Sequence, residues 1–432
     1  LLENSILDSS CVEKPSPTKR YKSEQTCLSL GSGMVAGTAE LVSKIGSDII
    51  QCHSDGEQPS KRTLFLSKHI IVLSKTTRFD YERQKHAELS LQQFRTILKR
   101  RGSNYAIMKK KHIQQQVYVN AICKALTENG IEVKVVSREE YTAEALQWAD
   151  AVFSAGGDGT FLIAAAKISD QRPVIGFNTD PLGSEGHLCI TRKSDQPVRG
   201  VIEKLLKGDF SWMWRQRIRV TILKWVEECK DVSEAEDEMC EKSDGLRKAM
   251  LFRTDSFDPE MPVLALNDVF IGESHAARVS YYDVQVDDGP MLRQKSSGLT
   301  VSTGTGSTSW NYNINRVSDQ HINDILSIMK TMGVLRVEPD DEMTSEICKR
   351  FNEKLIFEPH SSKMSFTVRD PVFNATFPAM APRGYASRIR VRSRCSDAHL
   401  VLDGGVSVPF NYGTEILLEV HREDALRSVM LL

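Results

Sequence analysis

The sequence predicts an α/β domain followed by a β-rich domain. Apolar segments of strand length alternate with helical patterns between residues 69 and 177, and this alternation is typical of a doubly wound parallel sheet. From about residue 210 the pattern changes to the two-residue period of antiparallel strands. We therefore expect an α/β domain over residues 63–208, a β-sandwich-like domain over residues 209–418, and a segment, residues 419–432, that packs back.

The bulk composition argues against several function classes. With 56 basic and 57 acidic residues the formal net charge is −1, so the sequence gives no support for a nucleic-acid or a membrane partner. Nine cysteines without CxxC spacing indicate free thiols in a reducing compartment, and they argue against a disulfide framework or a zinc site. No apolar run approaches the ~18 residues of a membrane span.

Three segments stand outside the two expected domains or interrupt them. Residues 1–62 are rich in Ser and mixed in charge, so we expect disorder there, and their acidic residues argue against an intact organellar transit peptide. Residues 227–260 form an acidic, polar insertion that we expect to be a mobile loop. Residues 318–358 form a helical insertion, with helices at 322–332 and 343–355.

In the α/β half, polar residues follow the predicted strands. We expect strands at 69–74, 131–136, 151–155 and 173–177, and helices at 114–128, 142–148 and 161–168. The carboxyl ends of parallel strands form the edge where ligands bind. Lys75 and Arg78 are therefore candidates for phosphate contacts, with a solvated loop as an equally open alternative. Asn178 is a further candidate for nucleotide binding, whereas His187 is expected to be a structural hydrogen-bond partner.

Residues 156–160, Gly-Gly-Asp-Gly-Thr, join a predicted strand directly to a predicted helix. Glycines let a ligand approach the main chain, and a helix that begins here points free N–H groups at an anion. The N–H groups of Gly157 and Gly159 and the hydroxyl of Thr160 are therefore candidates for phosphate binding. Asp158 would repel phosphate, so it is a candidate for chemistry or for holding a hydroxyl or a metal ion. The alternative is an ordinary turn with an N-capping Asp.

Three arginines open the second half. Arg215, Arg217 and Arg219 alternate with other residues in a strand-like period, so we expect them to share one face of a strand. Arg217 is the candidate for a contact with nucleotide phosphates. Surface or dimer salt bridges are the alternative.

Further along, polar residues interrupt apolar strands. Asn267 and Asp268 lie inside an apolar run, and because burying unpartnered polar groups costs about 1–3 kcal/mol each, they should face a ligand or a polar network. Residues 303–310 are rich in Gly, Ser and Thr, whose hydroxyls suit phosphate or ribose oxygens. Residues 287–290 and 403–405 are expected to be turns.

Taken in order, three stretches resemble the motifs of one family. Gly156-Gly157-Asp158-Gly159, Leu266-Asn267-Asp268-Val269 and Ser302-Thr-Gly-Thr-Gly-Ser-Thr-Ser-Trp310 resemble the GGDG, NE and TPTGSTAY motifs of NAD kinases. GGDG alone is shared with diacylglycerol, sphingosine and phosphofructokinase-type kinases, whereas the three together are far more specific. The resemblance runs from about residue 65 to the end and is strongest to the mitochondrial branch of animals.

This resemblance implies an NAD kinase/diacylglycerol kinase-like fold and a reaction. The γ-phosphoryl group of ATP would pass to the adenosine 2′-hydroxyl of NAD⁺, with Mg²⁺ held mainly by ATP. Asp158 would take the hydroxyl proton or orient the hydroxyl, and Asn267 and Asp268 would hold the adenosine part. Residues ringing the ribose and phosphates would be Thr305, Thr308 and Ser309. A homodimer and a mitochondrial location are also implied.

The chain departs from the family motifs at several positions. Asp268 stands for the usual Glu, Gly304 for Pro, Ser309-Trp310 for Ala-Tyr, and Ser297 for an Asp. Two other functions remain as alternatives: a lipid kinase of the diacylglycerol or sphingosine type, which shares GGDGT and a β-rich second half, and a non-catalytic dinucleotide-binding protein in which Asp158 is structural. The phosphate donor, ATP or polyphosphate, is open.

Overall fold

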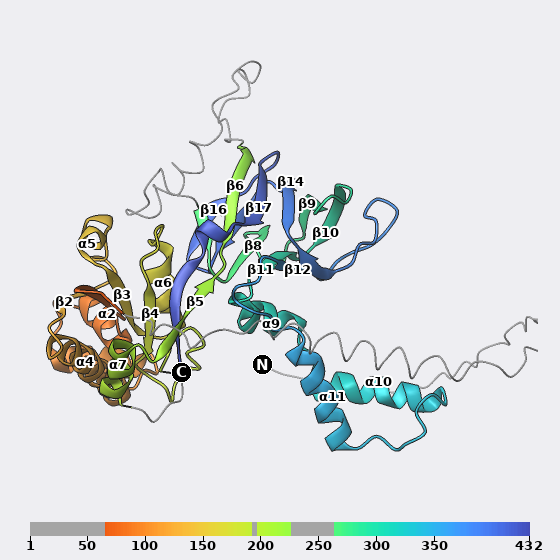
Figure 1. Cartoon of the computed structure of the whole chain (residues 1–432). Coiled ribbons are helices and arrows are strands. Elements are labelled where there is room, and N and C mark those ends of the chain that lie inside the picture. Colours follow the sequence, from red (N-terminus) through yellow and green to blue (C-terminus); the bar gives the residue numbers. More distant parts are fainter. Residues whose placement is uncertain (1–64, 192–196, 226–262) are drawn as a thin grey trace, which may run out of the picture. The chain divides into compact units, whose positions relative to one another are not determined.

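The computed structural model describes residues 65–191, 197–225 and 263–432 (Figure 1). The expected disorder of residues 1–62 and the expected acidic loop at 227–260 lie outside the described residues. These described residues belong to one compact unit. Within the described parts no helix is both long enough and apolar enough to span a membrane.

The first half contains a four-stranded parallel sheet in the order β2-β1-β3-β4. Its strands are β1 (His69–Ser74), β2 (Glu132–Val136), β3 (Ala151–Gly156) and β4 (Val174–Asn178). Every residue of β3 and β4 is buried, as expected for near-continuous apolar strands that are covered on both faces. All four predicted strands and the parallel, doubly wound arrangement are confirmed.

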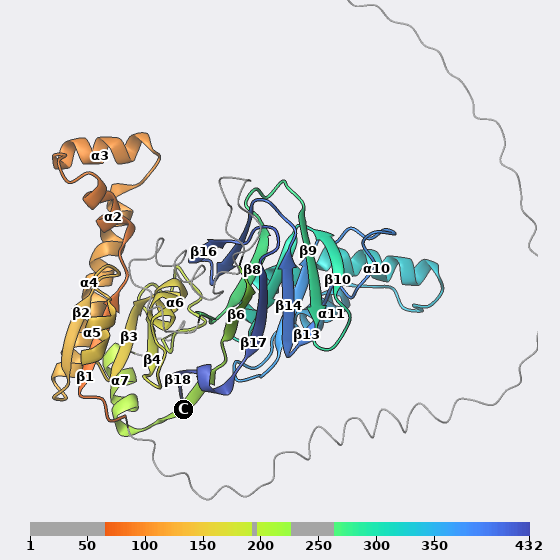
Figure 2. The same cartoon turned by 90° about the horizontal axis from the view of Figure 1, so that it is seen from above.

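Helices α4 (Tyr105–Thr127) and α7 (Val198–Lys207) cover one face of this sheet, and α5 (Ala143–Trp148) and α6 (Asp158–Ala166) cover the other. Helices α2 (Arg78–Lys85) and α3 (Leu91–Arg100) contact α4 and lie beyond the sheet (Figure 2). Successive residues of a strand face opposite sides. Accordingly Ile70 packs in the cluster that holds the apolar residues of α4 and α7, whereas Ile71 packs with those of α5 and α6.

Two helices at the start of the chain were not expected from the sequence. Thr77 N-caps α2 and forms a capping box with Asp80, so the predicted polar loop after β1 is a helix from Arg78 onward. A second capping box, Ser90 with Gln93, begins α3. The helix predicted at 114–128 begins earlier in the structure, at Tyr105. The sequence did not indicate this start because the basic first turns of the helix carry no apolar periodicity.

The second half is a sandwich of two six-stranded antiparallel sheets. One has the order β10-β9-β14-β17-β6-β7 and the other β13-β12-β11-β8-β15-β16. The strands are β6 (Ile218–Lys224), β7 (Val263–Ala265), β8 (Asp268–Glu273), β9 (Ser280–Val286), β10 (Leu292–Ser296), β11 (Gly298–Ser302), β12 (Met364–Arg369), β13 (Arg383–Ala386), β14 (Arg388–Ser393), β15 (Ala398–Leu402), β16 (Val406–Pro409) and β17 (Glu415–Val420). One apolar cluster takes residues from both sheets, which confirms the predicted sandwich-like fold.

Helices interrupt the sandwich between β11 and β12. They are η1 (Gly306–Thr308), α9 (Trp310–Asn315), α10 (Asp319–Thr331) and α11 (Asp341–Glu353). The last two correspond to the helices predicted at 322–332 and 343–355, and they lie side by side (Figure 1).

A two-stranded ribbon joins distant parts of the chain. β5 (Phe210–Arg215) pairs antiparallel with β18 (Leu426–Leu431), which follows the short helix η2 (Arg422–Asp424). Val429 of β18 belongs to the same apolar cluster as Ile70 and Phe153 of the parallel sheet. The ribbon therefore completes the core of the α/β half.

Candidate functional site

The glycine loop after β3 has the geometry expected of an anion-binding turn. β3 ends at Gly156, Gly157 is the N-cap of α6, and Asp158 is its first helical residue. Gly157 has no side chain to cap the helix, so the first N–H groups of α6 have no side-chain acceptor. Asp158 is inside the helix, so the alternative of an N-capping Asp is wrong. Gly159 is exposed beside it.

Asp158 is held in place by the loop that follows β4. The main-chain N–H groups of His187 and Leu188 donate to its two carboxylate oxygens, at 3.0 and 2.9 Å. A carboxylate has about four acceptor positions, so two remain for a ligand hydroxyl. The two loops predicted to share one sheet edge do meet, and His187 contributes its main chain, as a structural partner.

The next residue of the motif is more enclosed than expected. Thr160 is buried, and its side chain lies against Gly156, where any Cβ would collide with the hydroxyl. This close approach explains the glycine at position 156. It also leaves the Thr160 hydroxyl little access to a phosphate, in contrast to the prediction.

The side chain of Asn178 makes hydrogen bonds within the loop that follows β4. Its side-chain oxygen accepts hydrogen bonds from the Asp180 N–H at 3.1 Å and the Ser184 hydroxyl at 3.0 Å, and its amide donates to the Ser184 carbonyl at 3.3 Å. The side chain is completely buried. The prediction that Asn178 contacts a nucleotide is therefore wrong, because its polar atoms are used to shape the loop that holds Asp158.

The two basic residues after β1 differ in position. Lys75 is exposed, and its N–H donates to the carbonyl of Ala155, which places it beside the glycine loop. Lys75 forms no ion pair with any carboxylate in the described parts of the chain, so it remains a candidate for phosphate binding. Arg78 is instead the first residue of α2 and donates to the Ser103 hydroxyl at 3.2 Å.

The second and third motifs pack directly against each other. The Asn267 carbonyl accepts hydrogen bonds from the Thr303 N–H at 2.9 Å and the Ser302 hydroxyl at 3.2 Å. A Cβ at Gly306 would collide with this same carbonyl, so the loop requires glycine there. The side-chain oxygen of Asn267 is buried and has no hydrogen-bond partner within the described residues. An unpartnered buried acceptor is expected to face a ligand.

A buried carboxylate that was predicted to be only a turn former lies under the second motif. Asp403 accepts hydrogen bonds from the consecutive N–H groups of Leu266, Asn267 and Asp268 at 2.8, 2.7 and 3.2 Å. Burial, and then the negative charge of Asp403, raise the pKa of Asp268 to about 7. This shift brings the titration of Asp268 into the neutral pH range. The local sequence Asp-Gly-Gly shows only a turn, and nothing in it indicated this role.

The hydroxyls of the third motif are unequally accessible. Thr305 is buried and its hydroxyl accepts a hydrogen bond from Arg215 at 3.4 Å, whereas Thr308 and Ser309 are half-buried. The hydroxyl of Thr308 donates to the Thr305 carbonyl at 3.4 Å. Thr308 and Ser309 therefore keep the access to a ligand that was predicted for all three.

Comparison with known proteins finds similarity to NAD kinases. The family model described as "ATP-NAD kinase N-terminal domain" matches residues 64–210. An NAD kinase from Archaeoglobus fulgidus in complex with ATP is a distant structural relative, 17% identical with a TM-score of 0.46, covering 84% of this chain and 93% of that chain. The human protein named "NAD kinase 2, mitochondrial" is 40% identical over 375 residues and 85% of each chain. The rat protein of that name is 40% identical over 85% of this chain and 88% of its own.

The chain belongs to the NAD kinase family. Its activity is that of an NAD⁺ kinase, so the lipid kinase and the non-catalytic dinucleotide-binding protein are both wrong as alternatives. The resemblance predicted from the three motifs is confirmed.

In this NAD kinase the arginine stripe predicted to bind phosphates does not exist. The chain leaves β5 after Arg215 and enters β6 at Ile218, so the three arginines do not share a strand. Arg217 is 2% exposed, and its guanidinium donates to the carbonyls of Asp424 and Ile168 at 2.5 and 2.6 Å. The prediction that Arg217 contacts a nucleotide is wrong, because its donors are used inside the protein. Burial lowers the pKa of Arg217 to about 10, against the opposing charge of Asp424.

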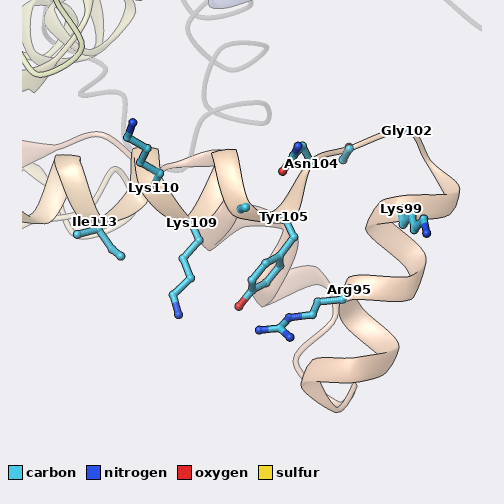
Figure 3. A pocket seen from close by; sticks show the side chains of 10 residues that line it. Arg95, Lys99, Gly102, Asn104, Tyr105, Lys109, Lys110 and Ile113 are labelled. Atoms are coloured by element: carbon cyan, nitrogen blue, oxygen red, sulfur yellow. The ribbon is translucent and has the colours of Figure 1, made fainter.

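A pocket of this NAD kinase lies apart from the motif residues. It has a volume of about 1010 Å³ and lies over α3 and α4, where the side chains of Arg95 and Tyr105 point toward each other (Figure 3). Its other basic residues are Lys99, Lys109 and Lys110. Since no residue of the three motifs lines it, this pocket is not part of the site described above.

Gly304, which stands where the family has Pro, allows a testable prediction. A Cβ at this position would collide with the main-chain carbonyl of Glu358, which cannot rotate away as a side chain could. We expect Gly304→Ala to lower the free energy of unfolding by about 1–3 kcal/mol, measured by urea denaturation. Gly200→Ala is the control, because among the described residues its methyl group would meet only Pro197, at 3.9 Å, and alanine favours a helix. Equal midpoints for Gly304→Ala and the parent protein would contradict the close packing.

Proposed function

We propose that this NAD kinase transfers the γ-phosphoryl group of ATP to the adenosine 2′-hydroxyl of NAD⁺, with Asp158 addressing that hydroxyl. The observation that carries the proposal is the fixed carboxylate of Asp158 at an uncapped helix N-terminus. Its neighbours His187 and Leu188 leave acceptor positions open toward a ligand. The uncapped N–H groups around Gly159 suit phosphate oxygens.

A ribose hydroxyl is a weak nucleophile until its proton has an acceptor. Asp158 accepts a hydrogen bond from the 2′-hydroxyl, orients it, and receives its proton as the new P–O bond forms. General-base help of this kind is worth about 10²–10⁴ in rate. The remaining barrier depends on positioning and on charge neutralisation, to which the exposed ammonium of Lys75 beside the loop contributes.

The described residues contain no group of three or more His, Cys, Asp or Glu side chains placed to hold a metal. The family resemblance implies Mg²⁺, which would be held mainly by ATP oxygens and would there neutralise phosphate charge.

Asn267 and Asp268 form the dinucleotide side of the site in this proposal. The free side-chain oxygen of Asn267 suits a donor group of the adenosine part. Asp268, with its pKa near neutrality, can either donate to or accept from a sugar hydroxyl. The accessible hydroxyls of Thr308 and Ser309 add contacts to ribose or phosphate oxygens.

A steady-state assay tests these assignments. NADPH formation, coupled through an NADP⁺-dependent dehydrogenase, should require NAD⁺, ATP and a divalent ion, and EDTA should abolish it until Mg²⁺ is restored. Asn267→Ala should raise KM for NAD⁺ about tenfold, the loss of one buried hydrogen bond, with KM for ATP unchanged. If KM for ATP rose instead, the second motif would belong to the donor site. Polyphosphate in place of ATP tests the donor.

We also propose a mitochondrial location, which is supported by the names of the human and rat relatives. The homodimer implied by the family resemblance would be tested by light scattering on the purified chain.

A further inference from the structure

Asp403 sits in the turn between β15 and β16. Its φ is +50° and that of the following Gly404 is +64°, so this Asp-Gly pair has the two positive φ values that such a turn requires and that Asp tolerates. Because the backbone conformation is ordinary for this pair, the informative feature is where the Asp403 carboxylate makes its contacts.

Those contacts all go to the second motif. Three consecutive N–H groups, of residues 266 to 268, converge on the Asp403 carboxylate from 135 to 137 positions away in the chain. The N–H of Asp403 in turn donates to the Asp268 carbonyl at 3.0 Å. Four hydrogen bonds therefore fix the peptide planes from which the side chains of Asn267 and Asp268 emerge.

The other side of the second motif is held by the third. The Asn267 carbonyl accepts from Thr303, and Gly306 packs against it. The three-residue segment 266–268 is thus held on one side by Asp403 and on the other side by the third-motif loop. A small rotation of this segment would move the buried, unpartnered oxygen of Asn267.

We propose that Asp403 is a positioning residue for dinucleotide binding, which orients Asn267 and Asp268 toward NAD⁺ without touching the substrate. This inference rests on the proposed role of the second motif. The negative charge of Asp403 also faces Asp268, and Arg217 is the cation that acts on Asp403 itself. Removing the charge of Asp403 should therefore lower the pKa of Asp268. Any limb of the pH profile that depends on Asp268 should then shift toward acid.

The turn between β9 and β10 provides a matched control. Asp287 has nearly the same backbone conformation, with φ +49°, and its carboxylate accepts two consecutive N–H groups, from Ser387 and Arg388, at 2.8 and 2.9 Å. Within the described parts of the chain, Asp287 makes no hydrogen bond to any of the three motifs. A general loss of turn stability would therefore affect Asp287→Asn and Asp403→Asn alike.

The experiment compares these variants in the full chain. Asp403→Asn is isosteric, but its amide N–H₂ group would face main-chain N–H groups of residues 266–268, which need an acceptor. We therefore expect KM for NAD⁺ to rise about tenfold while KM for ATP stays within about twofold. Asp287→Asn should change neither KM. In Asp403→Asn the pH profile of kcat/KM for NAD⁺ should also shift toward acid. Asp403→Gly, which suits the positive φ, is a second variant that lacks the carboxylate.

Each outcome decides one point. If folded Asp403→Asn or Asp403→Gly keeps the parent KM for NAD⁺ while Asn267→Ala raises it, this inference is overturned and the proposed function stands. If Asn267→Ala itself leaves that KM unchanged, the proposed role of the second motif fails. If neither Asp403 variant folds while Asp287→Asn does, Asp403 is a structural residue and the positioning role is overturned.

Discussion

Replacing Asp158 by Asn is expected to leave the protein folded and able to bind NAD⁺, and to lower kcat about a hundredfold or more. In the parent protein the N–H groups of His187 and Leu188 donate to the two carboxylate oxygens of Asp158. The amide of the variant keeps one oxygen to accept from them. It cannot receive the proton of the 2′-hydroxyl, and that help is worth about 10²–10⁴ in rate.

Single-turnover measurement of phosphoryl transfer checks this expectation, with thermal unfolding as the control for folding. Asp150→Asn is the matched variant, because the Asp150 carboxylate likewise accepts two consecutive N–H groups, those of Lys68 and His69, at 2.8 and 2.9 Å. Asp150 precedes β3, whereas Asp158 follows it. Turnover of Asp158→Asn within about tenfold of the parent rate would show that Asp158 is not the base.

Replacing Arg217 by Met is expected to destabilise the fold by about 3–5 kcal/mol. The substitution keeps the aliphatic volume but removes the guanidinium donors from the carbonyls of Asp424 and Ile168, whereas the Ala165 carbonyl still accepts from the N–H of Ile168 at 3.2 Å. Unsatisfied buried acceptors cost about 1–3 kcal/mol each, and the buried carboxylate of Asp403 loses the cation that acts on it.

Urea denaturation of the purified variants measures this loss. The control is Arg388→Met, which breaks the exposed ion pair with Asp288 and should cost at most about 1 kcal/mol. If Arg217→Met and Arg388→Met unfolded at the same urea concentration, the buried guanidinium would not be a structural centre. An Arg217 variant with normal stability but a raised KM for ATP would restore the phosphate-binding interpretation.

Strong apolar runs made most of the fold predictable from the sequence. β1, β3 and β4 were predicted because their residues are buried on both faces, so their composition alone marks them. α2 and α3 were missed although each begins with a capping box that is visible in the sequence. α2 buries none of its residues, so the apolar periodicity on which helix prediction depends was absent.

The site was predictable where function depends on local motifs, and it was not where function depends on distant packing. Asp158, Asn267 and the third-motif loop were singled out as candidates because their glycines and polar residues break apolar runs. Asp403 acts on main-chain groups at least 135 residues away, so its own neighbours show only a turn. Arg217 fits a strand period in the sequence. In the structure it lies between the end of β5 and the start of β6, and its side chain is buried.

The pairing of β18 with β5 has a consequence for biosynthesis. Leu426 and Val429 fill the apolar clusters of the α/β half, yet a ribosome reaches them only after making the whole sandwich. During synthesis the α/β half therefore has an incomplete core until β18 has been made. Contacts between residues so far apart in the sequence also form slowly. We expect this half to depend on chaperones during translation, and a tag or deletion that disturbs Leu426–Leu431 to lower the yield of active enzyme through degradation of a half-finished chain.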